Sequence, residues 1–222
     1  MPLRVHCSVE EGMLMLRRRM TILFQGDSIT DCRRQDDPEG LGFGHVRYIA
    51  AHLLSTYPEL ELRIVNRGIS GNRVCDLQAR WDKDCIELNP GLVTVLIGIN
   101  ETVRRFDEND PTSTRRFRET YHDILTRTRE NTDAGLVLCE PFLTDVGDEV
   151  ARWRADLTPR IDVVRDLARE FHAVLIPLDG LFAAASTRLP GTYWAADGVH
   201  PTTAGYGLIT RAWLREVDPT KE

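Results

Sequence analysis

The sequence of 222 residues has few lysines and no excess of positive charge. Lys83 and Lys221 are its only lysines, so nearly all of its 28 basic residues are arginines, and 34 acidic residues outnumber them to give a net charge of −6 at pH 7. The arginines are scattered and mostly lie near Asp or Glu, as on a solvated surface. A protein that binds a phosphate backbone normally carries a basic patch, so we expect no nucleic-acid partner.

The chain also lacks a long apolar run and a recognisable cysteine motif. No stretch approaches the roughly 18 apolar residues of a membrane span, and the short apolar run at residues 13–16 precedes positive charge instead of following it, unlike a secretory signal. We therefore expect no membrane partner. The five cysteines are an odd number, and no two stand at the two-residue gap of a zinc or redox motif. Free thiols, no metal and a cytoplasmic location fit this pattern best. The cysteines are Cys7, Cys32, Cys75, Cys85 and Cys139.

What the chain does contain is the composition and periodicity of an α/β protein. Apolar residues make up 42% and charged residues 28%, as in ordinary soluble domains. Short apolar runs alternate with longer stretches of helical period, which is typical of a parallel sheet covered on both faces. The sequence therefore predicts a three-layer α/β/α sandwich with a five-stranded parallel sheet. The predicted strands lie at residues 21–24, 62–65, 92–97, 136–138 and 173–176.

Helical periodicity is clearest after Gly147, where apolar residues recur at steps of three or four and would form one stripe on the sheet. Those residues are Val150, Trp153, Leu157, Ile161, Val164, Ala168 and Phe171. Pro159 lies inside the stripe and predicts a kink or break there. Residues 45–54 and the region around 121–125 predict two further helices.

The chain shows no internal repeat and no low-complexity linker, so we expect one domain spanning residues 20–217. Residues 1–19 are interpreted as a tail of unknown role. Met13, Met15 and Met20 are each candidates for the true first residue of the protein. Residues 218–222 form a short tail at the other end.

Polar residues follow the predicted strands at the positions where a parallel sheet places its reactive crevice. Gly26-Asp27-Ser28 follows the first strand, a glycine-rich segment at residues 66–72 follows the second, and Gly98-Ile99-Asn100-Glu101 follows the third. Asp197-Gly198-Val199-His200 comes after the last strand and a longer excursion. We expect four loops at one edge of the sheet to bring a serine, an amide-rich turn, an asparagine and an Asp/His pair together.

These residue types are the parts that acyl transfer requires. The Ser28 hydroxyl needs a base, which the imidazole of His200 can supply, and Asp197 is close enough in sequence to orient that imidazole. Backbone N–H groups of Ser28 and Gly71 and the side chain of Asn100 can stabilise the oxyanion. Each also has a simpler interpretation: a serine can cap a helix, a glycine can serve a turn, and an asparagine can satisfy its own loop. Their combination favours catalysis.

The four blocks Gly26-Asp27-Ser28, Gly71, Asn100 and Asp197-Gly198-Val199-His200 resemble, in this order, those of the SGNH (GDSL-type) hydrolase superfamily. The resemblance runs from about residue 21 to residue 214. Asp31, the turn Gly42-Phe43-Gly44, and residues 66–72 and 77–81 are similar to a branch that includes intracellular acetylxylan esterases.

The resemblance implies a flavodoxin-like fold with Ser28 as nucleophile, His200 as base and Asp197 as its orienting partner. It implies that Ser28, Gly71 and Asn100 form the oxyanion hole and that no cofactor is required. Homo-oligomers are common among such proteins, so a homo-oligomer is also expected.

Two positions depart from the family pattern, and three others are candidates for contact with substrate. Glu101 stands where the family usually has Asp, and Val103 stands where an aromatic often precedes the arginine. The candidates are Asp27, Arg104 and Trp194, with Tyr193 as an alternative aromatic platform. For Asp27 we favour a structural role, in which the carboxylate binds nearby backbone N–H groups. Arg104 is equally well explained as a solvated residue.

The sequence therefore predicts a serine esterase that removes small acyl groups, chiefly acetyl, from a carbohydrate or related alcohol. Its partner would be a small-molecule ester. A lysophospholipase or an acyl-thioesterase on the same scaffold is the alternative, because neither scaffold nor triad determines the acyl pocket. A carbohydrate-binding protein that has kept the fold without catalysis is a further alternative, which the intact set of polar residues argues against.

Overall fold

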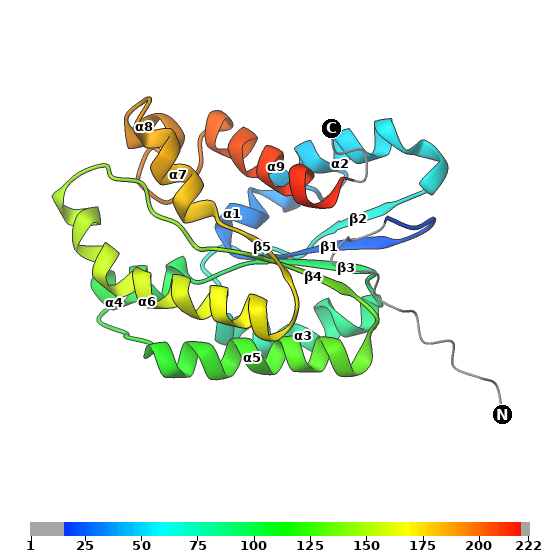
Figure 1. Cartoon of the computed structure of the whole chain (residues 1–222), viewed down its shortest axis with the longest axis horizontal. Helices are drawn as coiled ribbons and strands as arrows, with labels where there is room; N and C mark the ends of the chain where they lie inside the picture. The colour runs from blue at the N-terminus through cyan, green and yellow to red at the C-terminus, as the bar shows by residue number, and fades with distance from the viewer. Residues whose placement is uncertain (1–15, 219–222) are drawn as a thin grey trace.

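The structure is a computed structural model that describes residues 16–218, and its centre is a five-stranded parallel sheet in the order β2-β1-β3-β4-β5 (Figure 1). The strands are β1 (Thr21–Gly26), β2 (Arg63–Asn66), β3 (Leu92–Leu96), β4 (Gly135–Cys139) and β5 (Val174–Ile176). Each predicted strand is confirmed, with ends that differ by at most two residues. This strand order places a topological switch point between β1 and β3, where open α/β sheets bind their ligands.

Helices cover both faces of the sheet, which confirms the predicted α/β/α sandwich (Figure 1). One face carries α1 (Ser28–Asp31), α2 (His45–Thr56), α7 (Leu178–Ser186), α8 (Gly191–Trp194) and α9 (Thr203–Val217). The other carries α3 (Val74–Asp84), α4 (Ile99–Asp107), α5 (Thr114–Asn131) and α6 (Asp148–Glu170). Short 3-10 turns occur at Arg34–Asp36, Pro58–Leu60 and Ile86–Leu88.

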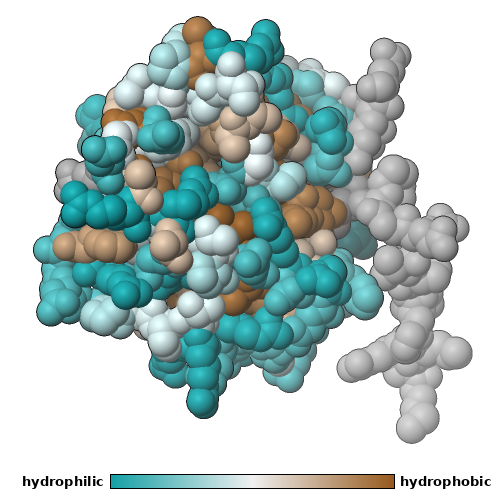
Figure 2. All heavy atoms as spheres, turned by 60° about the vertical axis from the view of Figure 1, so that its left-hand side comes forward, coloured by the Kyte–Doolittle hydropathy of each residue, from teal (hydrophilic) through white to brown (hydrophobic). Residues whose placement is uncertain are grey.

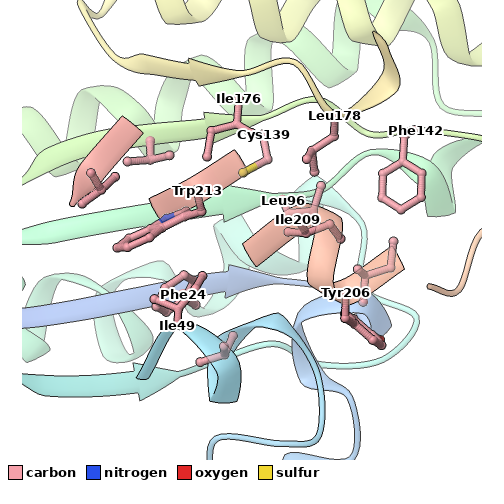
Figure 3. Close-up of a cluster of buried hydrophobic side chains, with 14 of the residues drawn as sticks. Phe24, Ile49, Leu96, Cys139, Phe142, Ile176, Leu178, Tyr206, Ile209 and Trp213 are labelled. Atoms are coloured by element: carbon pink, nitrogen blue, oxygen red, sulfur yellow. The ribbon is translucent and has the colours of Figure 1, made fainter. Parts of the chain in front are cut away.

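Alternation along the strands builds two apolar cores, because successive strand residues point to opposite faces. In β3, Leu92 and Leu96 join the core under α2 and α9, while Val93 and Val95 join the core under α3 and α5. Figure 3 shows the first of these cores, in which the ring of Phe24 in β1 lies 5.5 Å from that of Trp213 in α9 and Leu96 of β3 lies near Ile209 of the same helix. Both faces of the sheet are therefore apolar, as the continuous strand runs predicted.

Helix α6 runs unbroken through Pro159, so the break that the sequence predicted does not form. Leu157 and Ile161, on either side of the proline, are 0% and 2% exposed. Because both turns bury apolar side chains, packing outweighs the backbone hydrogen bond that proline removes. Phe171, which the apolar stripe included, is the residue that caps the end of this helix.

Part of the predicted N-terminal tail contacts the domain. Leu16 packs against the first core, and the side chains of Arg18 and Arg19 both form ion pairs with Glu61. The rest of that tail, residues 1–15, and residues 219–222 lie outside the described residues. In the part of the chain that is described, no helix has the length and apolar character needed to cross a membrane.

Candidate active site

Ser28 is the first residue of α1, directly beyond the end of β1. The Asp27 carboxylate caps this short helix by accepting a hydrogen bond from Ile29 N–H at 3.0 Å. Gly26 leaves no room for a side chain, since a Cβ there would lie 2.3 Å from Thr30 Oγ1 and 2.5 Å from the carbonyl oxygen of Leu96. The strand-to-helix turn is therefore tight and fixed, and it sets the serine at the switch point of the sheet.

A continuous chain of hydrogen bonds joins Ser28 to residues about 170 positions later in the sequence. Ser28 Oγ lies 2.9 Å from His200 Nε2, and His200 Nδ1 lies 2.6 Å from Asp197 Oδ2. These distances fit a neutral imidazole whose Nδ1–H donates to Asp197 and whose Nε2 accepts from the serine. The structure thus brings together the serine, histidine and aspartate that the sequence singled out.

The backbone around Asp197 holds its carboxylate in place. Oδ1 accepts hydrogen bonds from the N–H groups of Val199 at 3.0 Å and His200 at 2.7 Å. Partial burial alone would raise the pKa of Asp197, but the hydrogen bonds from the His200 ring and these N–H groups outweigh it and hold the pKa below its ordinary value. Asp197 is therefore kept ionised beside the imidazole.

The loop that carries Asp197 and His200 is braced by the segment after β4. Thr144 N–H donates to the Gly198 carbonyl at 2.9 Å. Gly198 has a φ of +86°, and a Cβ there would approach the Thr144 carbonyl to 3.1 Å and a Val150 methyl to 3.0 Å. Only glycine combines this left-handed backbone with so close an approach.

Asn100 is the second residue of α4, so it lies in the first turn of a helix and not in the loop that the sequence predicted. Its Nδ2 donates a hydrogen bond to the Asn72 carbonyl at 2.9 Å. Gly71, immediately before Asn72, has a φ of +80°. The structure therefore brings Asn100 against the glycine turn, as expected if both contribute to one oxyanion hole.

The segment from Asn66 to Asn72 is tied to α1 by several hydrogen bonds. Ile69 N–H donates to the Gly26 carbonyl at 3.1 Å, and Ser70 Oγ donates to Asp31 Oδ2 at 2.8 Å. A Cβ on Gly68 would lie 2.3 Å from Asp31 N, so no side chain fits at this contact. Asp31 and residues 66–72, which carry the resemblance to one branch of the family, thus form a single bonded unit.

Arg80 is a functional neighbour that the sequence reasoning missed. Its Nε donates to Asn72 Oδ1 at 3.0 Å, and its Nη1 donates to Gln25 Oε1 and Asp84 Oδ2, both at 3.0 Å. Arg80 thereby fastens the glycine turn to β1 and α3. The only signal in the sequence was its place in the segment at residues 77–81 that resembles the acetylxylan esterase branch.

Of the candidates for contact with substrate, Asp27 is the one that lies inside the protein. It is 1% exposed, and burial, with a smaller contribution from the charge of Glu101, raises its pKa to about 7. Because Asp27 Oδ1 caps α1 and the residue is enclosed by protein, its position favours the structural interpretation over contact with substrate.

Arg104 and the aromatic pair Tyr193 and Trp194, the other candidates, lie in different surroundings. The Arg104 guanidinium lies over Gly71, with Nη2 3.5 Å from the position that a Cβ there would occupy, and it pairs with Glu108. Trp194 is partly buried against the first core and donates through Nε1 to the Leu189 carbonyl at 3.3 Å. Tyr193 is 50% exposed, with its ring 5.0 Å from that of Trp194. Tyr193 therefore presents the more accessible ring.

Figure 2 brings forward the side of the molecule toward which α4 and α8 project in Figure 1. On this face apolar and hydrophilic residues are interspersed. Among residues 16–218, no three His, Cys, Asp or Glu side chains gather in a way that could hold a metal ion.

The chain belongs to the GDSL-like lipase/acylhydrolase family, whose pattern matches residues 24–208. This confirms the resemblance that the four blocks indicated and makes the protein a carboxylic ester hydrolase. Among characterised proteins, it is 36% identical over 206 residues to an acetylxylan esterase from Geobacillus stearothermophilus, covering 88% of this chain and 93% of that one.

Solved structures agree with this assignment. A GDSL-like protein from Parabacteroides merdae has a TM-score of 0.88 and 33% identity, covering 92% of this chain and 98% of that one. The Geobacillus acetylxylan esterase has a TM-score of 0.84 and 33% identity, with 91% and 96% covered. Variants of that esterase lacking a serine, an aspartate or a histidine are described as its catalytic mutants.

Proposed function

We propose that this protein is a serine esterase that hydrolyses small acyl esters, chiefly acetyl esters of carbohydrates, with Ser28 as nucleophile. The observation that carries the proposal is the hydrogen-bonded chain from Ser28 Oγ through both nitrogens of His200 to Asp197, with distances of 2.9 and 2.6 Å. A hydroxyl is a weak nucleophile until a base takes its proton, and this geometry supplies the base already oriented.

The reaction proceeds in two halves. Ser28 Oγ attacks the ester carbonyl while His200 Nε2 takes the hydroxyl proton, and Asp197 stabilises the imidazolium that forms. The imidazolium then protonates the departing alcohol and leaves an acyl-enzyme. Water, deprotonated by His200, attacks the acyl carbon and releases the acid, which restores the free serine.

Three donors stabilise the negative oxygen formed in each half. The Ser28 and Gly71 N–H groups contribute from the backbone, and the positive φ of Gly71 sets the turn that carries its N–H. Asn100 Nδ2 has two hydrogens, and the bond to the Asn72 carbonyl engages one of them, which orients the amide and leaves the second for the oxyanion. Donors fixed before the reaction need no reorganisation when charge develops.

A water-soluble sugar ester suits the rim better than a lipid. The Tyr193 backbone is tied to Thr202, two residues after His200, and its exposed ring offers an aromatic face, while the Arg104 guanidinium beside Gly71 offers a hydrogen-bond donor. These groups match the apolar face and the hydroxyl groups of a sugar. The similarity to an acetylxylan esterase supports the same substrate class.

Ser28→Ala tests the mechanism, with Ser55→Ala as a matched control. Ser55 is an exposed serine of α2 whose hydroxyl donates to carbonyl groups of its own helix. Turnover of 4-nitrophenyl acetate should fall by on the order of 10⁴–10⁶ in Ser28→Ala and stay unchanged in Ser55→Ala. Near-normal hydrolysis by folded Ser28→Ala protein would overturn the assignment of the nucleophile.

Chain-length profiling tests the substrate class. Activity should be highest on acetyl esters and on acetylated xylo-oligosaccharides, and should drop toward octanoyl esters. A steep rise from acetyl to octanoyl would instead favour the lysophospholipase or thioesterase alternative.

The cytoplasmic location and the homo-oligomer belong to the same proposal. Cys32, Cys75, Cys85 and Cys139 are free thiols, which suits a reducing compartment. Light scattering of the purified protein measures the oligomeric state directly.

A further inference from the structure

Glu101 carries a buried carboxyl group and is adjacent in sequence to Asn100, one of the proposed oxyanion donors. It follows Asn100 in the first turn of α4 and is 0% exposed. Its Oε1 accepts a hydrogen bond from Val74 N–H at 2.8 Å. Val74 is the first residue of α3, so its N–H has no partner within that helix, and Glu101 supplies the missing acceptor.

Two consecutive residues of α4 therefore hold the segment that follows Gly71. Asn100 Nδ2 binds the carbonyl of Asn72 at 2.9 Å, and Glu101 Oε1 binds the N–H of Val74 at 2.8 Å. Gly71 directly precedes this clamped segment, and a glycine at positive φ has no side chain of its own to fix its orientation. The direction of the Gly71 N–H thus depends on bonds made by its neighbours.

We propose that Glu101 is a positioning residue that aligns the two parts of the oxyanion hole, the Gly71 N–H and the Asn100 amide, by anchoring the start of α3 to the start of α4. This inference rests on the proposed function. Its physical basis is that a displacement of about 1 Å in a catalytic donor can lower a rate by on the order of 10²-fold.

Stability alone does not explain a carboxylate at this position. Burial raises the pKa of Glu101 above its ordinary value, and Oε2 has no hydrogen-bond partner among the described residues. An incompletely satisfied buried carboxyl group is costly compared with an apolar side chain of similar size. A buried group that lowers stability in this way is expected where it serves the function of the protein.

Two substitutions separate the reach of the side chain from its charge. Glu101→Gln keeps both the length and an acceptor oxygen for Val74 N–H, so kcat should stay within about threefold of the parent. Glu101→Asp keeps the acid but is one methylene shorter, so kcat should fall by about 10- to 100-fold while KM stays within about twofold. Affinity for an alkylboronic acid, whose adduct with Ser28 is a tetrahedral anion, should fall by the same factor as kcat.

Glu140→Asp is the matched control. Glu140 is also 0% exposed and also accepts a backbone N–H, from Asp179 at 3.2 Å, but it follows β4 and has no bond to the glycine turn. Its shortening should lower the Tm and leave kcat within about twofold.

Val74→Pro removes the same hydrogen bond from the donor side and tests the inference even where Glu101→Asp fails to fold. Proline is well tolerated at the first position of a helix, and Arg73 before it already has an extended backbone with φ −104° and ψ 174°. The losses in kcat from Val74→Pro and Glu101→Asp should not add in the double variant.

The inference is overturned if folded Glu101→Asp or folded Val74→Pro keeps kcat within threefold of the parent, or if only the Tm of these two variants falls. Retained activity in Ser28→Ala would instead refute the proposed function itself, so the two failures are distinguishable.

Discussion

Asp27→Asn removes a buried carboxyl group without changing its shape. Asp27 is 1% exposed, its Oδ1 accepts the Ile29 N–H at 3.0 Å, and its Oδ2 has no partner among the described residues. Burial is the main cause that raises its pKa, from 3.8 to about 7, and the negative charge of Glu101 adds to it. Asparagine keeps an oxygen to cap α1 and carries no charge, so the variant isolates the effect of ionisation.

The size and sign of the effect follow from this pKa. A shift of about three units at about 1.36 kcal/mol each corresponds to roughly 4 kcal/mol. Because the pKa is higher in the folded state, the unfolded chain releases the proton first. The contribution to the free energy of unfolding is thus fully present below about pH 4 and is lost as the pH rises to about 7. For a domain of this size, the loss corresponds to about 10 °C in Tm.

Thermal unfolding followed by circular dichroism between pH 4 and pH 8.5 measures this contribution. The Tm of Asp27→Asn minus that of the parent should increase from about pH 4 to about pH 7 and then level off, since all other titrating groups are common to both proteins. Asp36→Asn, which removes an exposed carboxylate near the same helix, should change the Tm little. A difference between Asp27→Asn and the parent that does not vary with pH would refute the reasoning.

Three further substitutions test other parts of the structure. Asn100→Ala should lower kcat by about 10²–10³-fold with little change in KM in steady-state kinetics, and a change confined to KM would make Asn100 a binding residue. Tyr193→Ala should raise KM for acetylated xylo-oligosaccharides several-fold but not for 4-nitrophenyl acetate, whereas an equal change for both substrates would contradict a role in sugar binding. Trp213→Phe deletes the hydrogen bond from Trp213 Nε1 to Thr94 Oγ1, 2.9 Å long and buried in the first core, and should lower the free energy of unfolding by about 1–3 kcal/mol in urea at unchanged kcat. An unchanged urea midpoint would show that this bond contributes nothing.

The elements that the sequence predicted best are those defined by periodicity. The five strands follow apolar runs that must be covered on both faces, and α6 follows an apolar stripe that packs on the sheet. A kink or a break was expected at Pro159, and the break does not form, because the local rule on backbone hydrogen bonding took no account of the buried residues on either side. Tertiary packing keeps the helix continuous at Pro159, and such packing cannot be inferred from a short window of sequence.

The sequence predicted the parts of the site that lie in short local blocks, but not the bonds that join different elements. Ser28, Asp197 and His200 belong to short blocks whose residue types suggest one chemistry, and the structure brings their side chains together. The bonds of Arg80 to Asn72 and of Glu101 to Val74 join residues on different elements, with no periodic or local signal. The sequence identified Glu101 as a departure from the family pattern, but whether its longer side chain reaches a partner depended on how α3 and α4 pack.

The α8 segment and the loop that follows it form a structure closed on itself. Thr202 N–H bonds the Trp194 carbonyl at 2.9 Å, its hydroxyl bonds the Tyr193 carbonyl at 2.7 Å, and Ala195 pairs with Pro201 as an isolated antiparallel bridge. The glycine turn beside Ser28, in contrast, is bonded to β1 through the Ile69 N–H and to α3 through Arg80. A graft that exchanges residues 188–196 for those of another hydrolase would consequently alter the segment before the Asp197–His200 turn and leave the bonds around Ser28 in place, which makes this segment the place to test whether Tyr193 influences alcohol preference.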